Sequence, residues 1–95
     1  MLTEKQIDII LEVFKPYNPK KIGIFGSVAR NEDTTNSDID ILYQFYTPIS
    51  LFDKACIQND LEKRLKKKVD LVAEKFMHPR FKDYILADLN VIYEH

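Results

Sequence analysis

The stretch Gly26-Ser27-Val28-Ala29-Arg30, followed after a short polar loop by Ser37-Asp38-Ile39-Asp40, decides the fold of this chain. Apolar residues typical of strands flank both halves, at Ile22, Ile24, Phe25, Ile41, Leu42 and Tyr43. The pattern predicts a strand, a glycine turn into a short helix, a loop and a second strand. Side chains at i and i+2 of a strand share a face about 7 Å apart, so Asp38 and Asp40 should point to the same place.

Two carboxylates that point to the same place repel each other unless a cation lies between them. Mg²⁺ fits this position because it is a hard cation that prefers oxygen ligands. It usually binds one or two carboxylates together with substrate phosphates. The pair Asp38 and Asp40 therefore predicts a magnesium site.

The first half of the stretch has the residues expected of a phosphate site. Gly26 allows a tight turn and a close approach of the backbone to a ligand. We expect Ser27 to cap the following helix, whose free N–H groups and positive dipole end suit an anion. Arg30 lies about one turn further on, where its guanidinium can pair with a phosphate oxygen.

Length and composition indicate one small domain, residues 1–95, with a modest core. The chain is 45% hydrophobic and has a formal charge of −1, so its overall charge gives no argument for binding nucleic acid or membrane. No apolar run approaches the roughly 18 residues of a membrane span, and we expect a cytoplasmic protein. Cys56 is the only cysteine, which excludes an internal disulfide, and we expect it to be buried on a helix.

Hydrophobic periodicity predicts helices outside the central stretch. The first covers about residues 3–15 and begins with a capping box formed by Thr3 and Gln6. The second runs from a Ser50 cap to about Lys66, with its apolar face at Leu51, Ala55, Ile57, Leu61 and Leu65. The third begins at Pro79 and ends near residue 89, and His78 before it is expected to be a loop or capping residue. Strands are predicted at residues 21–25, 38–43, 69–73 and 91–93.

Two charged features allow alternative interpretations. Asp70 interrupts an otherwise apolar strand, so it lies either at an exposed sheet edge or beside Asp38 and Asp40 as a third carboxylate. A basic cluster, Lys63, Arg64, Lys66, Lys67 and Lys68, follows the second long helix. It is either a solvated helix end that complements the dipole or a contact surface for RNA or an acidic partner.

The motif residues together resemble the signature of the DNA polymerase beta-like nucleotidyltransferase superfamily, a glycine-serine pair followed by aspartate-x-aspartate. The short length, the Val69-Asp70-Leu71-Val72 strand and the ending in Val91-Ile92-Tyr93-Glu94 are similar to minimal nucleotidyltransferases. The resemblance covers nearly the whole chain. One departure is Asn31 after the motif arginine, where many relatives have glycine; asparagine tolerates left-handed backbone better than most residues.

The resemblance implies an α/β (α+β) fold with a small mixed sheet of about four strands flanked by helices. It implies that Asp38 and Asp40 bind two Mg²⁺ ions and that Asp70 is a third catalytic and metal-binding carboxylate and the base. Gly26 and Ser27 would hold the distal phosphates of ATP, and Arg30 and Ser37 are further nucleotide-binding candidates. The implied reaction transfers AMP from ATP to a hydroxyl, a tyrosine of a partner HEPN-domain toxin, so that the protein acts as an antitoxin.

Two alternatives to this reaction stay open. In the first, the protein is a binding subunit that inhibits its partner by occlusion, because 95 residues leave little surface for an acceptor pocket beside the nucleotide. In the second, the acceptor is a small molecule or an RNA end, although enzymes of those kinds usually carry a further domain for the acceptor. A homo-oligomer could supply the missing wall of the site.

Overall fold

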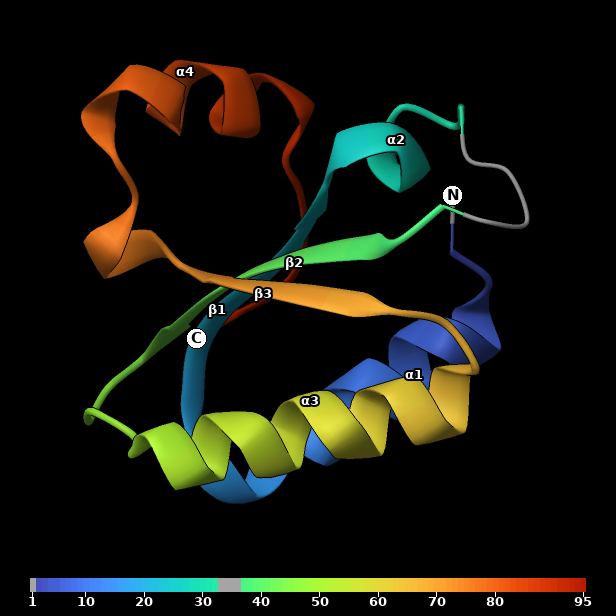
Figure 1. Cartoon of the computed structure of the whole chain (residues 1–95), viewed down its shortest axis with the longest axis vertical. Coiled ribbons are helices and arrows are strands. Elements are labelled where there is room, and N and C mark those ends of the chain that lie inside the picture. Colours follow the sequence, from blue (N-terminus) through green and yellow to red (C-terminus); the bar gives the residue numbers. More distant parts are fainter. Residues whose placement is uncertain (1, 33–36) are drawn as a thin grey trace.

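The computed structural model describes residues 2–32 and 37–95, and this part of the chain forms one four-stranded mixed sheet with helices on both faces (Figure 1). In chain order the elements are α1 (Glu4–Phe14), β1 (Pro19–Phe25), α2 (Gly26–Ala29), β2 (Ile39–Phe45), α3 (Leu51–Leu65), β3 (Val69–Ala73), α4 (Pro79–Asp88) and β4 (Asn90–Glu94). Short 3₁₀ helices follow α1 and β3, at Lys15–Tyr17 and Glu74–Phe76. The predicted fold class is confirmed. The short polar loop predicted between Arg30 and Asp38 lies largely outside the described residues.

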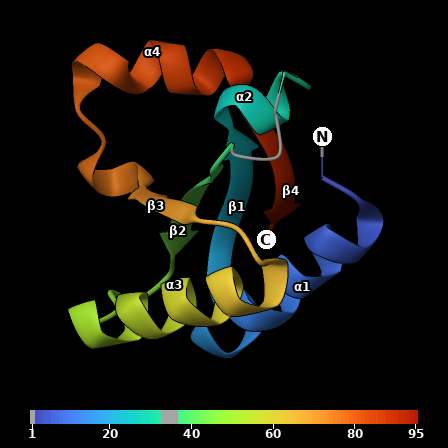
Figure 2. The same cartoon turned by 45° about the vertical axis from the view of Figure 1, so that its right-hand side comes forward.

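The strand order is β3-β2-β1-β4. β1 lies antiparallel to its two neighbours β2 and β4, whereas β2 and β3 are parallel. A parallel pair needs a long crossover connection, and α3 forms it here. Helices α1 and α3 cover one face of the sheet, while α2 and α4 lie on the other (Figures 1 and 2).

The hydrophobic core fills the space between the sheet and the helices α1 and α3. Ile39, Ile41 and Tyr43 of β2 belong to it. Successive strand residues point to opposite faces, so Asp40 is directed to the face with α2 and α4. The other elements contribute Ile10, Val13, Phe14, Ile22, Ile24, Val28, Ile57, Leu61, Leu65, Val69 and Leu71. The apolar alternation of β2 thereby places its carboxylate outside the core.

The three long helices begin as the sequence predicts. Thr3 and Gln6 form the reciprocal capping box at the start of α1. At α3, the hydroxyl of Ser50 accepts a hydrogen bond from the N–H of Asp53 at 3.0 Å. His78 is a capping residue, because its Nδ1 accepts a hydrogen bond from the N–H of Arg80 at 3.0 Å. Within the described residues, no helix is long and apolar enough to cross a membrane.

The predicted apolar face of α3 is too broad, and the prediction for Cys56 is wrong. Only Ile57, Leu61 and Leu65 of this helix are buried, whereas Leu51 is 86% exposed and Ala55 and Cys56 are also exposed. Each residue turns the helix by about 100°. Residues four apart, such as Ile57 and Leu61, therefore stay on one side, while the positions of Ala55 and Cys56 rotate away from the sheet.

The basic cluster at the end of α3 lies where the chain enters β3. Arg64 Nη2 forms an ion pair with Glu12 Oε2 of α1 at 3.1 Å, which ties the two helices together at the surface. Lys66 ends α3 in the left-handed conformation, and its N–H donates to the carbonyl of Glu62. These contacts favour the interpretation of the basic cluster as a solvated helix end.

Helix α4 is fixed to the sheet at its C-terminal end. None of its residues is buried. Leu89, directly after the helix, packs so closely on β1 that a Cβ added to Gly23 would lie 2.4 Å from Leu89 Cδ1. Asn90 then begins β4 and pairs with Ile24 of β1. The last residue of α4 is therefore held near the end of β1.

Two leucines on α3 test the observed burial. Leu61→Ala should lower the free energy of unfolding by about 2–4 kcal/mol, because Leu61 is fully buried and its truncation leaves a cavity. Leu51→Ala, the matched control on the same helix, should change it by less than about 0.5 kcal/mol. Urea unfolding followed by circular dichroism measures both values. Equal losses in the two variants would contradict the observed face of α3.

Candidate active site

Gly26 makes a turn that only glycine can make at this point. Its φ is +78°, in the left-handed region that residues with a side chain avoid. A Cβ placed on Gly26 would also lie 2.2 Å from Asp40 Oδ2, a distance at which the two atoms would overlap. The backbone of the turn after β1 therefore passes directly beside the carboxylate of Asp40 in β2.

The short helix α2 follows at once, and the prediction that Ser27 caps it is wrong. The N-cap position is Phe25, which forms no side-chain hydrogen bond, because the helix already starts at Gly26. Ser27 is half-buried in the first turn, and within the described residues no hydrogen bond of its hydroxyl is found. The N–H groups of a first helical turn have no acceptor inside the helix, so Ser27 and these groups are free to meet a ligand.

The segment after α2 turns through Asn31, which has a φ of +60°. Asparagine is among the few side-chain residues that adopt this conformation readily, as expected where relatives have glycine. Ser37, the remaining candidate from the motif, is half-buried and directly precedes Asp38.

Three carboxylates lie near the N-terminal ends of β2 and β3, although they do not converge closely enough to hold one metal ion together. In the parallel register Asp40 lies beside Asp70, and paired residues point to the same face of a sheet. Asp38 directly precedes β2, which begins at Ile39, one residue later than predicted. Both interpretations of Asp70 hold, because β3 is an edge strand, Asp70 is exposed, and it lies next to Asp40.

The charges of this carboxylate group are not balanced by ion pairs. Within the described residues, Asp38, Asp40 and Asp70 form no ion pair or hydrogen bond through their side chains. Burial, followed by the charges of Asp70 and Asp38, raises the pKa of Asp40 to about 6, against an opposing effect of Arg30. Half of the Asp40 carboxyl groups are therefore protonated near pH 6 when no cation is bound.

The donor set of this site fits Mg²⁺. Asp38 and Asp40 offer only carboxylate oxygens, which are the ligands this ion prefers, and neither forms an ion pair within the described residues. Among the described residues, no three acidic, histidine or cysteine side chains converge as a metal cage. The role of Asp70 as a third metal ligand therefore stays a prediction. Mg²⁺ usually takes one or two carboxylates and completes its shell with water and substrate phosphates.

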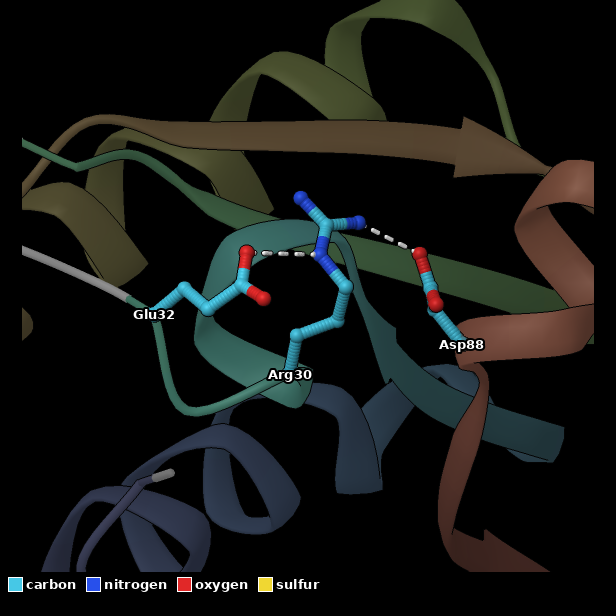
Figure 3. Close-up of polar contacts among 3 residues, drawn as sticks. All are labelled: Arg30, Glu32 and Asp88. Carbon is cyan, nitrogen blue, oxygen red and sulfur yellow. Dashed lines mark hydrogen bonds and ion pairs between the residues drawn. The ribbon is translucent and has the colours of Figure 1, made fainter.

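Arg30 lies at the end of α2 between two carboxylates that sequence analysis did not single out (Figure 3). Its Nε donates to Glu32 Oε2 at 3.2 Å, and its Nη1 donates to Asp88 Oδ2 at 2.5 Å. The hydrogen bonds to Asp88 and then Glu32 raise the pKa of Arg30. The sequence could have drawn attention to Asp88, because an acidic residue at a helix C-terminus is unfavourable beside the negative end of the helix dipole and therefore needs another reason for its position.

An apolar cleft lies at the opposite end of the parallel strands. It has a volume of about 200 Å³ and is lined mainly by aromatic and aliphatic side chains, including Tyr43, Phe45, Ile49 and Phe76. None of the three carboxylates lines it. The candidate active site is thus an open arrangement of charged groups beside the glycine turn, and the apolar cleft is a separate feature.

Comparison with known proteins gives consistent matches. The family described as "Polymerase beta, Nucleotidyltransferase" matches residues 8–95. MJ0126 of Methanocaldococcus jannaschii, provisionally named a protein adenylyltransferase, is 47% identical over 79 residues, which cover 82% of this chain and 81% of the relative. Protein adenylyltransferase MntA of Thermococcus cleftensis is 32% identical over 94 residues, covering 94% of this chain and 95% of the relative.

Solved structures share the fold. A structure provisionally described as a minimal nucleotidyltransferase superimposes with a TM-score of 0.79 at 30% identity, covering 90% of this chain and 88% of that one. A toxin-antitoxin structure with AMP-PNP gives a TM-score of 0.83 at 19% identity, covering 94% and 73%. A complex of a tri-AMPylated HEPN toxin with an MNT antitoxin from Shewanella oneidensis gives 0.79 at 16% identity, covering 99% and 74%.

The raised pKa of Asp40 predicts a pH-dependent effect of Asp40→Asn on stability. Folding raises this pKa from 3.8 to about 6, so ionised Asp40 opposes folding, and the stability present below pH 3.8 is lost as the pH rises through 6. With a chelator present, Asp40→Asn should therefore be more resistant to urea than the wild type at pH 8. The difference should shrink as the pH falls from 6 to 4. A difference that does not change between pH 4 and pH 8 would contradict the electrostatic analysis.

The two glycines of the chain make a matched pair for a second test. Gly26→Ala should abolish metal binding and lower the free energy of unfolding by more than about 1 kcal/mol, because its Cβ meets Asp40 in a left-handed turn. Gly23→Ala should also destabilise the fold, through Leu89, but should leave metal binding intact. Mn²⁺ binding followed by electron paramagnetic resonance distinguishes them. Metal binding by Gly26→Ala equal to that of the wild type would contradict the role of the turn.

Proposed function

Because the chain belongs to the polymerase beta nucleotidyltransferase family, we propose that it is a magnesium-dependent enzyme that transfers AMP from ATP to a hydroxyl of a protein. The observation that carries this proposal is the register of β2 and β3, which brings Asp70 beside Asp40, next to the turn at Gly26. A relative that is 32% identical over nearly the whole chain is named a protein adenylyltransferase, which supports a protein as the acceptor.

Each residue of the site has a role in the proposed reaction. Asp38 and Asp40 would hold two Mg²⁺ ions, and Gly26 and Ser27 would hold the distal phosphates of ATP, with Arg30 and Ser37 as further nucleotide contacts. When bound, the ions would activate the attacking hydroxyl and stabilise the leaving oxygen in an in-line displacement.

The carboxylate of Asp70 would act as the base in this reaction. It lies beside Asp40 and is exposed, so an acceptor hydroxyl can reach it and give up its proton there. The hydroxyl oxygen forms a bond to the α-phosphorus of ATP, the bond to the β-phosphate oxygen breaks, and pyrophosphate leaves. The acceptor gains AMP, and most of the rate enhancement comes from positioning and charge stabilisation.

We propose a HEPN-domain toxin as the partner and a tyrosine of that toxin as the acceptor, so that the transfer makes this protein an antitoxin. Structures with this fold include a complex of an MNT antitoxin with a tri-AMPylated HEPN toxin, and another contains AMP-PNP, which supports ATP as the donor. Asp70 is exposed and lies on the edge strand β3, so a whole protein can approach it from this edge of the sheet.

Two forms of labelled ATP test the reaction. The purified protein, Mg²⁺ and a lysate of the host are incubated with ATP labelled at the α-phosphate or at the γ-phosphate. We expect a protein band that takes up the α-label only. Asp40→Asn should lower this transfer by about a hundredfold or more, because it removes a charge that holds the metal ions. Asp60→Asn, which removes an exposed carboxylate from α3, is the matched control and should keep the wild-type rate.

The other outcomes separate the alternatives. Label from the γ-phosphate, or full transfer by Asp40→Asn, would overturn the proposed mechanism. Absence of labelled bands from a protein that binds Mg²⁺-ATP would instead favour inhibition of the partner by occlusion. A labelled RNA band in place of a protein band would identify an RNA end as the acceptor.

A further inference from the structure

We propose that Asp88, the last residue of α4, is a positioning residue that orients the guanidinium of Arg30 toward the phosphates of the nucleotide substrate. This inference rests on the proposed nucleotidyl transfer and adds to it a residue from the far end of the chain. Asp88 lies outside the motif stretch, 58 positions after Arg30, and the fold alone brings the two together.

The guanidinium of Arg30 is held from two sides (Figure 3). Nε donates to Glu32 Oε2 at 3.2 Å, and Nη1 donates to Asp88 Oδ2 at 2.5 Å. A guanidinium has five N–H groups in a planar fork. Two of them donate to Glu32 and Asp88, which fixes the orientation of the plane, and the other three have no partner among residues 2–32 and 37–95. Arg30 directly follows the single turn of α2, whose first residue, Gly26, lies beside the carboxylate of Asp40, so Arg30 belongs to the same site.

The location of Asp88 conflicts with the local preferences of a helix. A carboxylate at a helix C-terminus is repelled by the negative end of the dipole, and the last turn of α4 contains no basic residue to compensate. Places where a sequence departs from such a rule are often functional sites. The ion pair with Arg30 offsets the repulsion, so the position of Asp88 is explained by its partner and not by the stability of α4.

Both residues of this ion pair are held in place by contacts with the same strand, β1. Arg30 caps the C-terminal end of α2, and its backbone N–H donates to the carbonyl of Gly26 at 3.1 Å. Gly26 directly follows the last residue of β1. Asp88 is followed by Leu89, which packs on Gly23, and by β4, which pairs with β1. The guanidinium is therefore fixed relative to the glycine turn and to Asp40. Glu32 lies only two residues from Arg30 on the same segment and gives no such long-range support.

A double-mutant cycle tests the inference. Binding of Mg²⁺ with α,β-methylene-ATP, which cannot be cleaved between the α- and β-phosphates, is measured by calorimetry for four proteins: the wild type, Asp88→Asn, Arg30→Met and the double variant. Asp88→Asn should weaken binding about fivefold, the effect of losing one partly exposed ion pair. In the Arg30→Met background the same substitution should have no further effect, because Asp88 acts only through Arg30.

The control and the kinetics separate positioning from a structural role. Asp83→Asn replaces an exposed carboxylate on the same helix and should bind the analogue as the wild type does. In the labelled-ATP assay, Asp88→Asn should raise the KM for ATP more than it lowers kcat. A loss of affinity that persists in the Arg30→Met background would show that Asp88 only stabilises α4, and would overturn the inference.

Two further results would also overturn it, and one of them leaves the proposed function intact. Wild-type affinity of Asp88→Asn, or tighter binding because the carboxylate competes with phosphate for Arg30, would exclude positioning while nucleotide binding remains. Failure of the wild-type protein to bind Mg²⁺ with the analogue would instead overturn the proposed function and, with it, the role of Asp88.

Discussion

The parallel register between β2 and β3 is the constraint on which the site depends. Val69 and Leu71 are buried in the core on one face of β3, so Asp70 between them must point to the other face, beside Asp40. A shift of the register by one residue would turn Asp70 into the core and expose its neighbours. The same apolar alternation that stabilises the sheet therefore brings the carboxylates together.

The arrangement of these carboxylates lowers the stability of the folded protein. Burial, followed by the charges of Asp70 and Asp38, raises the pKa of Asp40, so the ionised carboxylate opposes folding when no cation is bound. The glycine turn adds a second constraint, since Gly26 must pass beside Asp40 without a side chain. Both features are common at functional sites, where local strain persists because the surrounding structure stabilises it.

Helix α4 brings a residue from late in the sequence, Asp88, into contact with Arg30 of the candidate active site. It buries none of its residues, and its attachment to the sheet is concentrated at the C-terminal end, where Leu89 packs on Gly23 and Asp88 pairs with Arg30. The rest of the helix lies over the face of the sheet that presents the carboxylates (Figure 2). The helix therefore places the carboxylate of Asp88 beside Arg30. Leu89, the one residue between α4 and β4, holds this carboxylate in place through its packing on Gly23.

By itself the sequence determined the order of the elements, most of their boundaries, and the positions of Asp38, Asp40 and Gly26, because periodicity, caps and a short motif are local features. The fold class was implied by the resemblance of the motif residues to a known family. It could not determine the buried face of α3, where Ala55 and Cys56 are exposed, or the N-cap of α2, because these depend on how the helices lie on the sheet and on where the turn ends. Only the tertiary structure showed that Asp70 is both exposed at the sheet edge and beside Asp40, and that Asp88 pairs with Arg30. The physical reason is that both join residues far apart in the chain, through strand register and helix packing that no local pattern specifies.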